Sequence, residues 1–267
     1  MMIIDFHTHG KLAKKLPFSK EYTHWLFSEA KEAGLDALCL TEHFNTSGFE
    51  EVYQYIYENS VPDGDSLLFD GLRIFPGMET DVEEGGHILC IGPMEAILSL
   101  NRELEPNKEK GKFLKFEELM NLFERYPVIV GGAHPFREGS HIPEFPREQL
   151  ERFHFFDLNG KDVAEQEEKT KSLTFQFGKD LNRKIVGGSD THQAVQYGCM
   201  SNLFKKECRT VEELYQEMIA DQYEIVISPN GSHMVKSAGI LKKALKEIHF
   251  LGGDYVSLLK GVVTHDF

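Results

Sequence analysis

The chain has 267 residues, 41% of them hydrophobic and 27% charged, so it is long enough to bury a full core. Its formal charge of −14 argues against a protein that grips nucleic acid through phosphate contacts, because such binding needs basic surface patches. Four dispersed cysteines indicate buried, reduced thiols, and the lack of a signal peptide or a long apolar run predicts a cytoplasmic protein.

Short apolar runs rich in β-branched residues recur along the chain and predict strands, at residues 2–6, 36–41, 72–79, 87–92, 127–133, 154–158, 184–188 and 223–228. Helical patterns lie between several of them. Ser19 caps one that Gly34 ends, Phe116 opens a second, and Thr210 with Glu213 forms a capping box for a third. Alternating strands and helices predict parallel βαβ units in an α/β fold. Their number favours a nearly closed barrel, with an open doubly wound sheet as the alternative.

Two further segments carry expectations of their own. Residues 101–112 are rich in charged and polar residues and predict a surface loop or lid. Residues 228–267 are richer in lysine and contain a helical pattern. We expect them to form a helical extension that packs on a single barrel domain spanning residues 1–267.

The first predicted strand ends in the motif DFHTH, which places Asp5, His7 and His9 at alternate positions. A His-x-His pair alone is weak evidence, because twelve histidines in this chain produce about 0.5 such pairs by chance. By the period of two, Asp5 shares the face of the two histidines, and we expect it to orient a ligand imidazole from deeper in the strand.

The ends of the other predicted strands carry the same chemistry. Six of the twelve histidines lie at or just after strand ends, beside carboxylates, where parallel barrels collect functional residues. The residues concerned are Glu42, His43, Glu79, Asp81, His87, His134, Arg137, Asp157, Asn159, Asp190 and His192. Imidazole with carboxylate suits zinc, manganese or iron, and so many candidate ligands exceed one tetrahedral site. The pattern therefore predicts two or three divalent ions.

In chain order, the motifs DFHTH, TEH, GMETD with GGHIL, GGAHPFR, LNG and GGSDTH resemble the series of the polymerase and histidinol phosphatase (PHP) superfamily, over residues 3 to about 193. The resemblance implies a distorted (β/α)7, TIM-like barrel with up to three metals at the strand ends. It implies that His7, His9 and Asp190 bind the first metal and that Glu79 bridges it to a second held by His87 and His134. His43 and His192 resemble ligands of the third.

The chain departs from the family pattern just after the first motif. Many members place another Asp or His about five residues beyond the His-x-His pair, whereas this chain has Lys14 and Lys15 in that region. The third metal is therefore expected to have fewer protein ligands, or to be absent. A lysine there could meet a substrate phosphate, or simply be solvated.

The implied activity is hydrolysis of a phosphate ester by a metal-bound hydroxide, with Arg137 binding the phosphoryl oxygens or forming a salt bridge at the rim. The lack of a basic tract interleaved with aromatic residues favours a small metabolite or nucleotide phosphomonoester over nucleic acid or a membrane. The alternatives are a metal-dependent amidohydrolase, which often uses a lysine at a strand end that this chain lacks, and a degenerate metal-binding regulatory module. Asn159 could contact substrate or serve a turn, and Glu42 is expected to be a barrel or rim residue that points away from His43.

Overall fold

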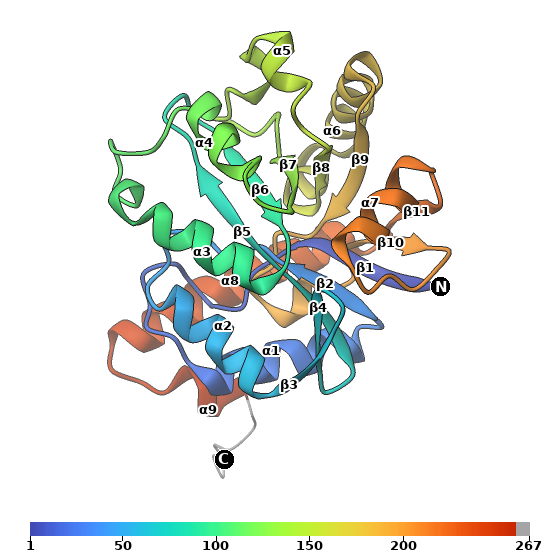
Figure 1. The fold of residues 1–267 in the computed structure, drawn as a ribbon. Coiled ribbons are helices and arrows are strands. Elements are labelled where there is room, and N and C mark those ends of the chain that lie inside the picture. The colour runs from blue at the N-terminus through green and yellow to red at the C-terminus, as the bar shows by residue number, and fades with distance from the viewer. Residues whose placement is uncertain (260–267) are drawn as a thin grey trace.

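The computed structural model describes residues 1–259 and shows a nearly closed barrel surrounded by helices (Figure 1). Its wall has the strand order β1-β2-β5-β6-β7-β8-β9. The bounds are β1 (Met2–Thr8), β2 (Ala37–Leu40), β5 (Leu72–Asp81), β6 (His87–Ile91), β7 (Ile129–Ala133), β8 (Phe155–Asn159) and β9 (Lys184–Gly188). The segment after β9 returns to β1 through a bridge between Thr8 and Thr191. The predicted α/β class and distorted TIM-like barrel are confirmed.

The prediction of parallel units is wrong for β6, which runs antiparallel to both β5 and β7. Gly85 and Gly86, with φ of 92° and 136°, turn the chain within a few residues and leave no length for a crossover helix. The first residue of β6 therefore lies at the same rim as the last residues of β5. This reversal places His87 opposite Asp81.

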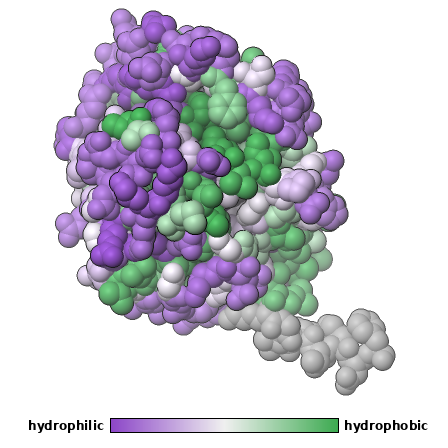
Figure 2. All heavy atoms as spheres, turned by 90° about the vertical axis from the view of Figure 1, so that its right-hand side faces the viewer, coloured by the Kyte–Doolittle hydropathy of each residue, from purple (hydrophilic) through white to green (hydrophobic). Residues whose placement is uncertain are grey.

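Every predicted strand is present, and the structure adds three that the sequence analysis missed. β3 (Ser60–Asp63) and β4 (Ser66–Phe69) form a hairpin that pairs with β5. β10 (Met200–Phe204) pairs with β1 and carries β11 (Tyr223–Ile227), so the predicted last strand extends the sheet outside the barrel. Figure 2 shows this side of the molecule, where apolar surface lies between hydrophilic areas.

The helices are α1 (Lys20–Glu32), α2 (Phe49–Glu58), α3 (Met94–Glu103), α4 (Phe116–Phe123), α5 (Arg147–Leu150), α6 (Gly160–Leu181), α7 (Val211–Ile219), α8 (Gly231–Phe250) and α9 (Tyr255–Leu259). Short 3-10 turns are η1 (Glu105–Asn107), η2 (Ile142–Glu144) and η3 (Ala194–Gln196). The Ser19 cap, the Thr210–Glu213 capping box and the helix at Phe116 are all as predicted. Among the described residues, no helix combines the length and apolar character needed to cross a lipid bilayer.

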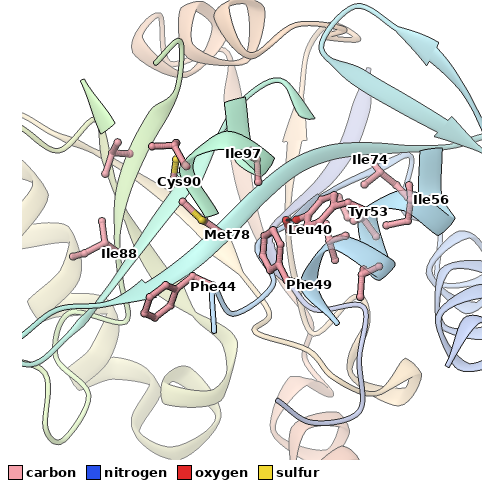
Figure 3. Close-up of a cluster of buried hydrophobic side chains, with 14 of the residues drawn as sticks. Leu40, Phe44, Phe49, Tyr53, Ile56, Ile74, Met78, Ile88, Cys90 and Ile97 are labelled. Carbon is pink, nitrogen blue, oxygen red and sulfur yellow. Dashed lines mark hydrogen bonds between the residues drawn. The ribbon is translucent and has the colours of Figure 1, made fainter. Parts of the chain in front are cut away.

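Two apolar clusters fill the fold. One collects side chains from all the barrel strands, including Phe6, Phe75 and Phe155, and is therefore the barrel interior. The other lies between the barrel wall and the helices, and Figure 3 shows the part of it between β2, β5, β6, α2 and α3. The cysteines at positions 39, 90, 199 and 208 are all free and buried, as predicted.

The expected loop at residues 101–112 is partly wrong. Residues 101–103 close α3, because Leu100 and Leu104 continue its apolar face into the core. Asn101 is buried and donates to the carbonyl of Phe44 over 2.6 Å. In the predicted extension, α8 packs against α6 and η3, and residues 260–267 lie outside the described residues.

Candidate metal centre

Glu79, near the end of β5, lies at the centre of five imidazoles at one rim of the barrel. Its Oε1 is 2.6 Å from His87 Nδ1, 3.2 Å from His134 Nε2 and 3.6 Å from His7 Nε2. Its Oε2 is 2.8 Å from His43 Nδ1 and 3.6 Å from His9 Nε2. The two oxygens of one carboxylate thus face different histidines.

All eight residues predicted as ligands belong to this constellation. Asp190 Oδ1 is 3.4 Å from His9 Nε2 and 4.0 Å from His7 Nε2, and the ring centroids of His192 and His9 are 4.1 Å apart. Three groups could each hold an ion: Glu79 with His87 and His134, His7 and His9 with Glu79, and His9 with His43 and His192. We call the first the carboxylate cluster and the last the histidine cluster.

Several buried polar atoms of this constellation make no hydrogen bond within the described structure. They are His7 Nε2, both ring nitrogens of His9 and His134 Nδ1. A buried polar atom without a partner costs about 1–3 kcal/mol, and native proteins keep few of them. Imidazole nitrogens and carboxylate oxygens are donors that zinc, manganese and iron accept. The residues present therefore fit a centre for divalent metal ions.

Hydrogen bonds behind the centre orient its imidazoles. His7 Nδ1 is 2.9 Å from Asp157 Oδ2, an oxygen that also accepts from Asn159 Nδ2 at 2.8 Å. His192 Nδ1 donates to the carbonyl of Lys11 over 2.8 Å, which leaves its Nε2 with a free lone pair for a ligand. Carboxylate and carbonyl partners of this kind fix the tautomer of a metal-binding imidazole.

The sequence analysis gave this role to Asp5, which is wrong. Asp5 Oδ1 instead accepts the backbone N–H groups of His7 and Ser189, at 3.1 and 2.9 Å, and so ties the first motif to the end of β9. Glu42, expected as a barrel or rim residue, lies just beyond β2 and beside His9. Glu42 is fully buried, accepts from Gly10 N–H at 3.1 Å, and lies 3.6 Å from His9 Nδ1.

Electrostatics hold two of these residues in the states that bind metal. Burial alone would raise the pKa of Glu79, but the imidazoles of His87, His43 and His7 hold it well below its usual range. Burial and the positive charges around His192 lower the pKa of that residue well below its usual range. An ionised carboxylate and a neutral imidazole are the forms that coordinate a cation.

The backbone is strained at two positions of the centre. His134 and Asp190 have φ of 32° and 55°, in the left-handed region, which costs a residue other than glycine about 1–3 kcal/mol. Gly188 is needed two residues before Asp190, because a Cβ there would lie 2.5 Å from both Asp157 Oδ1 and His7 Cβ. The strands therefore meet at the centre more closely than ordinary side chains permit.

Arg137, predicted to bind substrate, is held by three protein acceptors. Its Nε donates to Asp162 Oδ1 at 2.8 Å, its Nη1 to Asp190 Oδ2 at 3.0 Å and its Nη2 to Asn159 Oδ1 at 2.8 Å. An arginine has five N–H donors, so two remain for another ligand. Asn159 also caps α6 by accepting from Lys161 N–H at 3.0 Å, which matches the turn role considered for it.

Lys161 was not predicted as a site residue, yet its Nζ is 2.8 Å from Asp190 Oδ1. It lies only two residues beyond β8, so the claim that no strand end supplies a lysine was wrong. The motif LNGK contained the signal, but nothing local showed that the side chain turns toward the centre. Since its ammonium is ion-paired with Asp190, it is not a free metal ligand.

At the position of the family departure, Lys14 Nζ is 3.1 Å from Asp81 Oδ2, and Asp81 Oδ1 is 3.1 Å from His87 Nε2. Lys15 is exposed. Both lysines line a cleft of about 670 Å³. A second cleft, of about 540 Å³, is lined by Arg137 and Lys161 on the Asp190 side.

No family model matches the chain. A curated relative, described as a probable cytoplasmic isoleucine–tRNA ligase of Encephalitozoon cuniculi, is 27% identical over 145 residues, which is 54% of this chain and 12% of that protein. The chain thus spans only a small part of that relative's length.

Solved structures are similar in fold. PsfC from Pseudomonas syringae PB-5123 has a TM-score of 0.74 at 22% identity, over 91% of this chain and 98% of that one. The lesion-specific endonuclease Q of Pyrococcus furiosus has a TM-score of 0.63 at 17% identity, over 84% and 57% of the two chains. Endonuclease Q in complex with a 27-mer duplex that carries an abasic lesion has a TM-score of 0.61 at 17% identity, over 80% and 55%. The fold is shared, while the PHP resemblance stays a prediction.

Proposed function

We propose that the chain is a metal-dependent phosphoesterase that hydrolyses a small phosphomonoester. One observation carries the proposal: the two oxygens of Glu79 face different histidine groups, with His87 and His134 on one side and His43 and His9 on the other. A carboxylate in this position can join two ions. Two or three divalent ions of zinc, manganese or iron would supply an activated water and Lewis acids for a phosphoryl centre.

The chain's own residues perform the remaining tasks. Glu79 and Asp190 supply the negative charge that holds cations, and Asp157 fixes the His7 ring through Nδ1. Arg137 and Lys161 together hold Asp190, through Oδ2 and Oδ1 respectively. Their remaining N–H donors are placed to neutralise charge on a phosphoryl group that enters from the cleft beside them.

A small substrate is favoured over a polynucleotide. The formal charge of −14 repels a long polyanion, and clefts of about 670 and 540 Å³ are of the size that takes a metabolite or a nucleotide. The name of endonuclease Q describes that enzyme, and its likeness to this chain is one of fold. Hydrolysis of DNA is therefore an outcome that the experiment includes.

The test begins with metal analysis of the purified chain after supplementation with Mn²⁺, Zn²⁺ or Fe²⁺. Activity is then measured on p-nitrophenyl phosphate, sugar phosphates, nucleoside monophosphates, DNA oligonucleotides and an N-acetylated amino acid. We expect at least one metal ion per chain and hydrolysis of phosphomonoesters. Preferred hydrolysis of the amide would favour the amidohydrolase alternative, and metal binding without hydrolysis would favour a regulatory module.

Glu79→Gln keeps the shape of the central side chain but removes its charge. We expect it to lose most bound metal and at least about 100-fold in activity, because even partners behind metal ligands cost about 10–100-fold when changed. Glu83→Gln is the matched control, since Glu83 is exposed in the turn just after β5. Less than one metal ion per chain in the wild type, or full activity in Glu79→Gln, would overturn the proposal.

A further inference from the structure

The helix α8 places a lysine beside the centre from outside the barrel. Its buried positions include Ala238 and Leu245, and Lys242 falls between them at a spacing of four and three residues. Lys242 therefore shares the inward face of α8 and is half-buried. This face packs on α6, which begins with Gly160 and Lys161, and on η3, which begins two residues after His192.

Lys242 has no counterion of its own. Among the described residues it forms no ion pair and no hydrogen bond within the usual distances, although lysines are rarely buried unless paired. The charged groups that act on it are Lys161 and Lys246, which repel it, and Asp190 and Glu42, which attract it. Burial and the charge of Lys161 lower the pKa of Lys242 to about 8.

Of the two carboxylates that attract Lys242, Asp190 already has two cationic partners. Asp190 binds Lys161 at 2.8 Å through Oδ1 and Arg137 at 3.0 Å through Oδ2. The histidine cluster next to these groups has no carboxylate among its three members. The area where α8 meets the centre therefore has an excess of positive charge, which a bound anion would balance.

We propose that Lys242 and Lys161 form an anion subsite on the histidine-cluster side of the centre, which selects the dianionic phosphoryl group of a phosphomonoester over a monoanionic diester. The inference rests on the proposed function and names the residues that would select its phosphomonoester substrate. A monoester carries two negative charges near neutral pH, whereas a diester carries one and would balance less of the positive charge on this side of the centre. The extension that carries α8 is then part of the active site.

The test uses the metal-loaded chain and two chromogenic esters, p-nitrophenyl phosphate and bis(p-nitrophenyl) phosphate. Lys242→Met removes the charge and keeps the length of the side chain. We expect KM for the monoester to rise about tenfold, as for a lost charged contact, with kcat and metal content within about twofold of wild type. KM for the diester should change by less than about twofold, and Lys242→Arg should restore the monoester KM.

Lys243→Met is the matched control, because Lys243 is exposed one position further along the same helix. An equal rise in KM for both esters, or the same rise in Lys243→Met, would overturn the subsite. If Lys242→Met fails to fold, Lys242→Gln takes its place, with the same expected result.

A binding measurement separates this inference from the proposed function. Inorganic phosphate is titrated into the metal-loaded wild type and into Lys242→Met by calorimetry. If neither ester is hydrolysed, the proposed function fails, yet phosphate binding that weakens about tenfold in Lys242→Met still supports the subsite. Phosphate that binds both proteins equally, or binds neither, overturns it.

Discussion

The carboxylate cluster and the histidine cluster lie side by side but differ in charge. Glu79 is a member of the first and also lies 2.8 Å from His43 of the second, while Asp81, 3.1 Å from His87, adds negative charge beside the first. The second consists of His9, His43 and His192, and Lys161 and Lys242 help to lower the pKa of His192. A divalent cation is attracted by carboxylates and repelled by lysines. We therefore expect the carboxylate cluster to bind its ion firmly and the histidine cluster to exchange its ion readily.

The largest effect should come from removing one imidazole from each cluster. His134→Ala should lose more than about 100-fold in metal affinity and nearly all activity, because it weakens the ion that Glu79 holds. His192→Ala should lose one metal equivalent and keep the rest. Metal content and chelator competition measure both, with the exposed His233→Ala as control. Equal losses in the two variants would break the distinction between the clusters.

The groups behind the imidazoles offer a finer comparison. Asp157→Asn should weaken metal binding about 10–100-fold, because Asp157 fixes His7 through a 2.9 Å hydrogen bond. Glu42→Gln should have a smaller effect, since Glu42 lies 3.6 Å from His9 Nδ1. Chelator competition measures the metal affinity of both variants, and Asp180→Asn, on the exposed surface of α6, is the control. A stronger loss in Glu42→Gln would mean that His9 depends on its support more than His7 does.

Close packing at the centre predicts a loss of stability. Gly188→Ala should lower the free energy of unfolding by about 1–3 kcal/mol, because the new Cβ meets His7 and Asp157. Gly239→Ala, in α8 where a Cβ meets nothing within 4 Å, should raise it by about 0.5–1 kcal/mol. Urea unfolding measures both changes. A neutral Gly188→Ala would show that β9 can move away from the motif without cost.

Much of this arrangement could be predicted from local patterns. Strands were found because apolar runs and their ends are local signals, and the resemblance predicted which of the polar ends meet. Contacts set by distant parts of the chain were not found. Asp157 and His7 are 150 residues apart. The role of Asp5 was predicted from the strand period of two, which gives the face of a side chain but not its hydrogen-bond partner. The reversal at β6 changed the strand direction without moving His87 from the predicted rim, so that error was harmless.

Lysines were the least predictable part of the centre. Lys161 looks like an ordinary solvated residue in the first turn of a helix, and Lys242 looks like one of several lysines in a basic helical pattern. Their placement depends on how α6 and α8 pack over the rim, which is a tertiary property. The same physics that hides them from a sequence pattern, namely burial and mutual repulsion, gives Lys242 a measurable titration.

The smallest expected effect is a pH dependence that reports on the histidine-cluster side alone. The pKa of Lys242 is lowered to about 8, from 10.5, by burial and by Lys161 and Lys246, against the opposing charges of Asp190 and Glu42. A phosphate held by Lys242 should therefore bind several-fold more weakly as pH rises from about 7 to 9. Titrating inorganic phosphate across this range measures it, and Lys242→Arg, which stays charged, should flatten the profile.

Folding stability should rise with pH in the alkaline range, whereas the affinity for phosphate should fall. Between the folded pKa of about 8 and the unfolded value of 10.5, the unfolded chain keeps a proton at Lys242 that the folded chain has released. The state that binds more protons is disfavoured as pH rises, so the contribution of Lys242 to folding stability increases from about pH 8 to 10.5. Lys242→Met should lack this increase while Lys243→Met retains it. If phosphate affinity falls with pH but stability does not rise, the titrating group on this side of the centre is one other than Lys242.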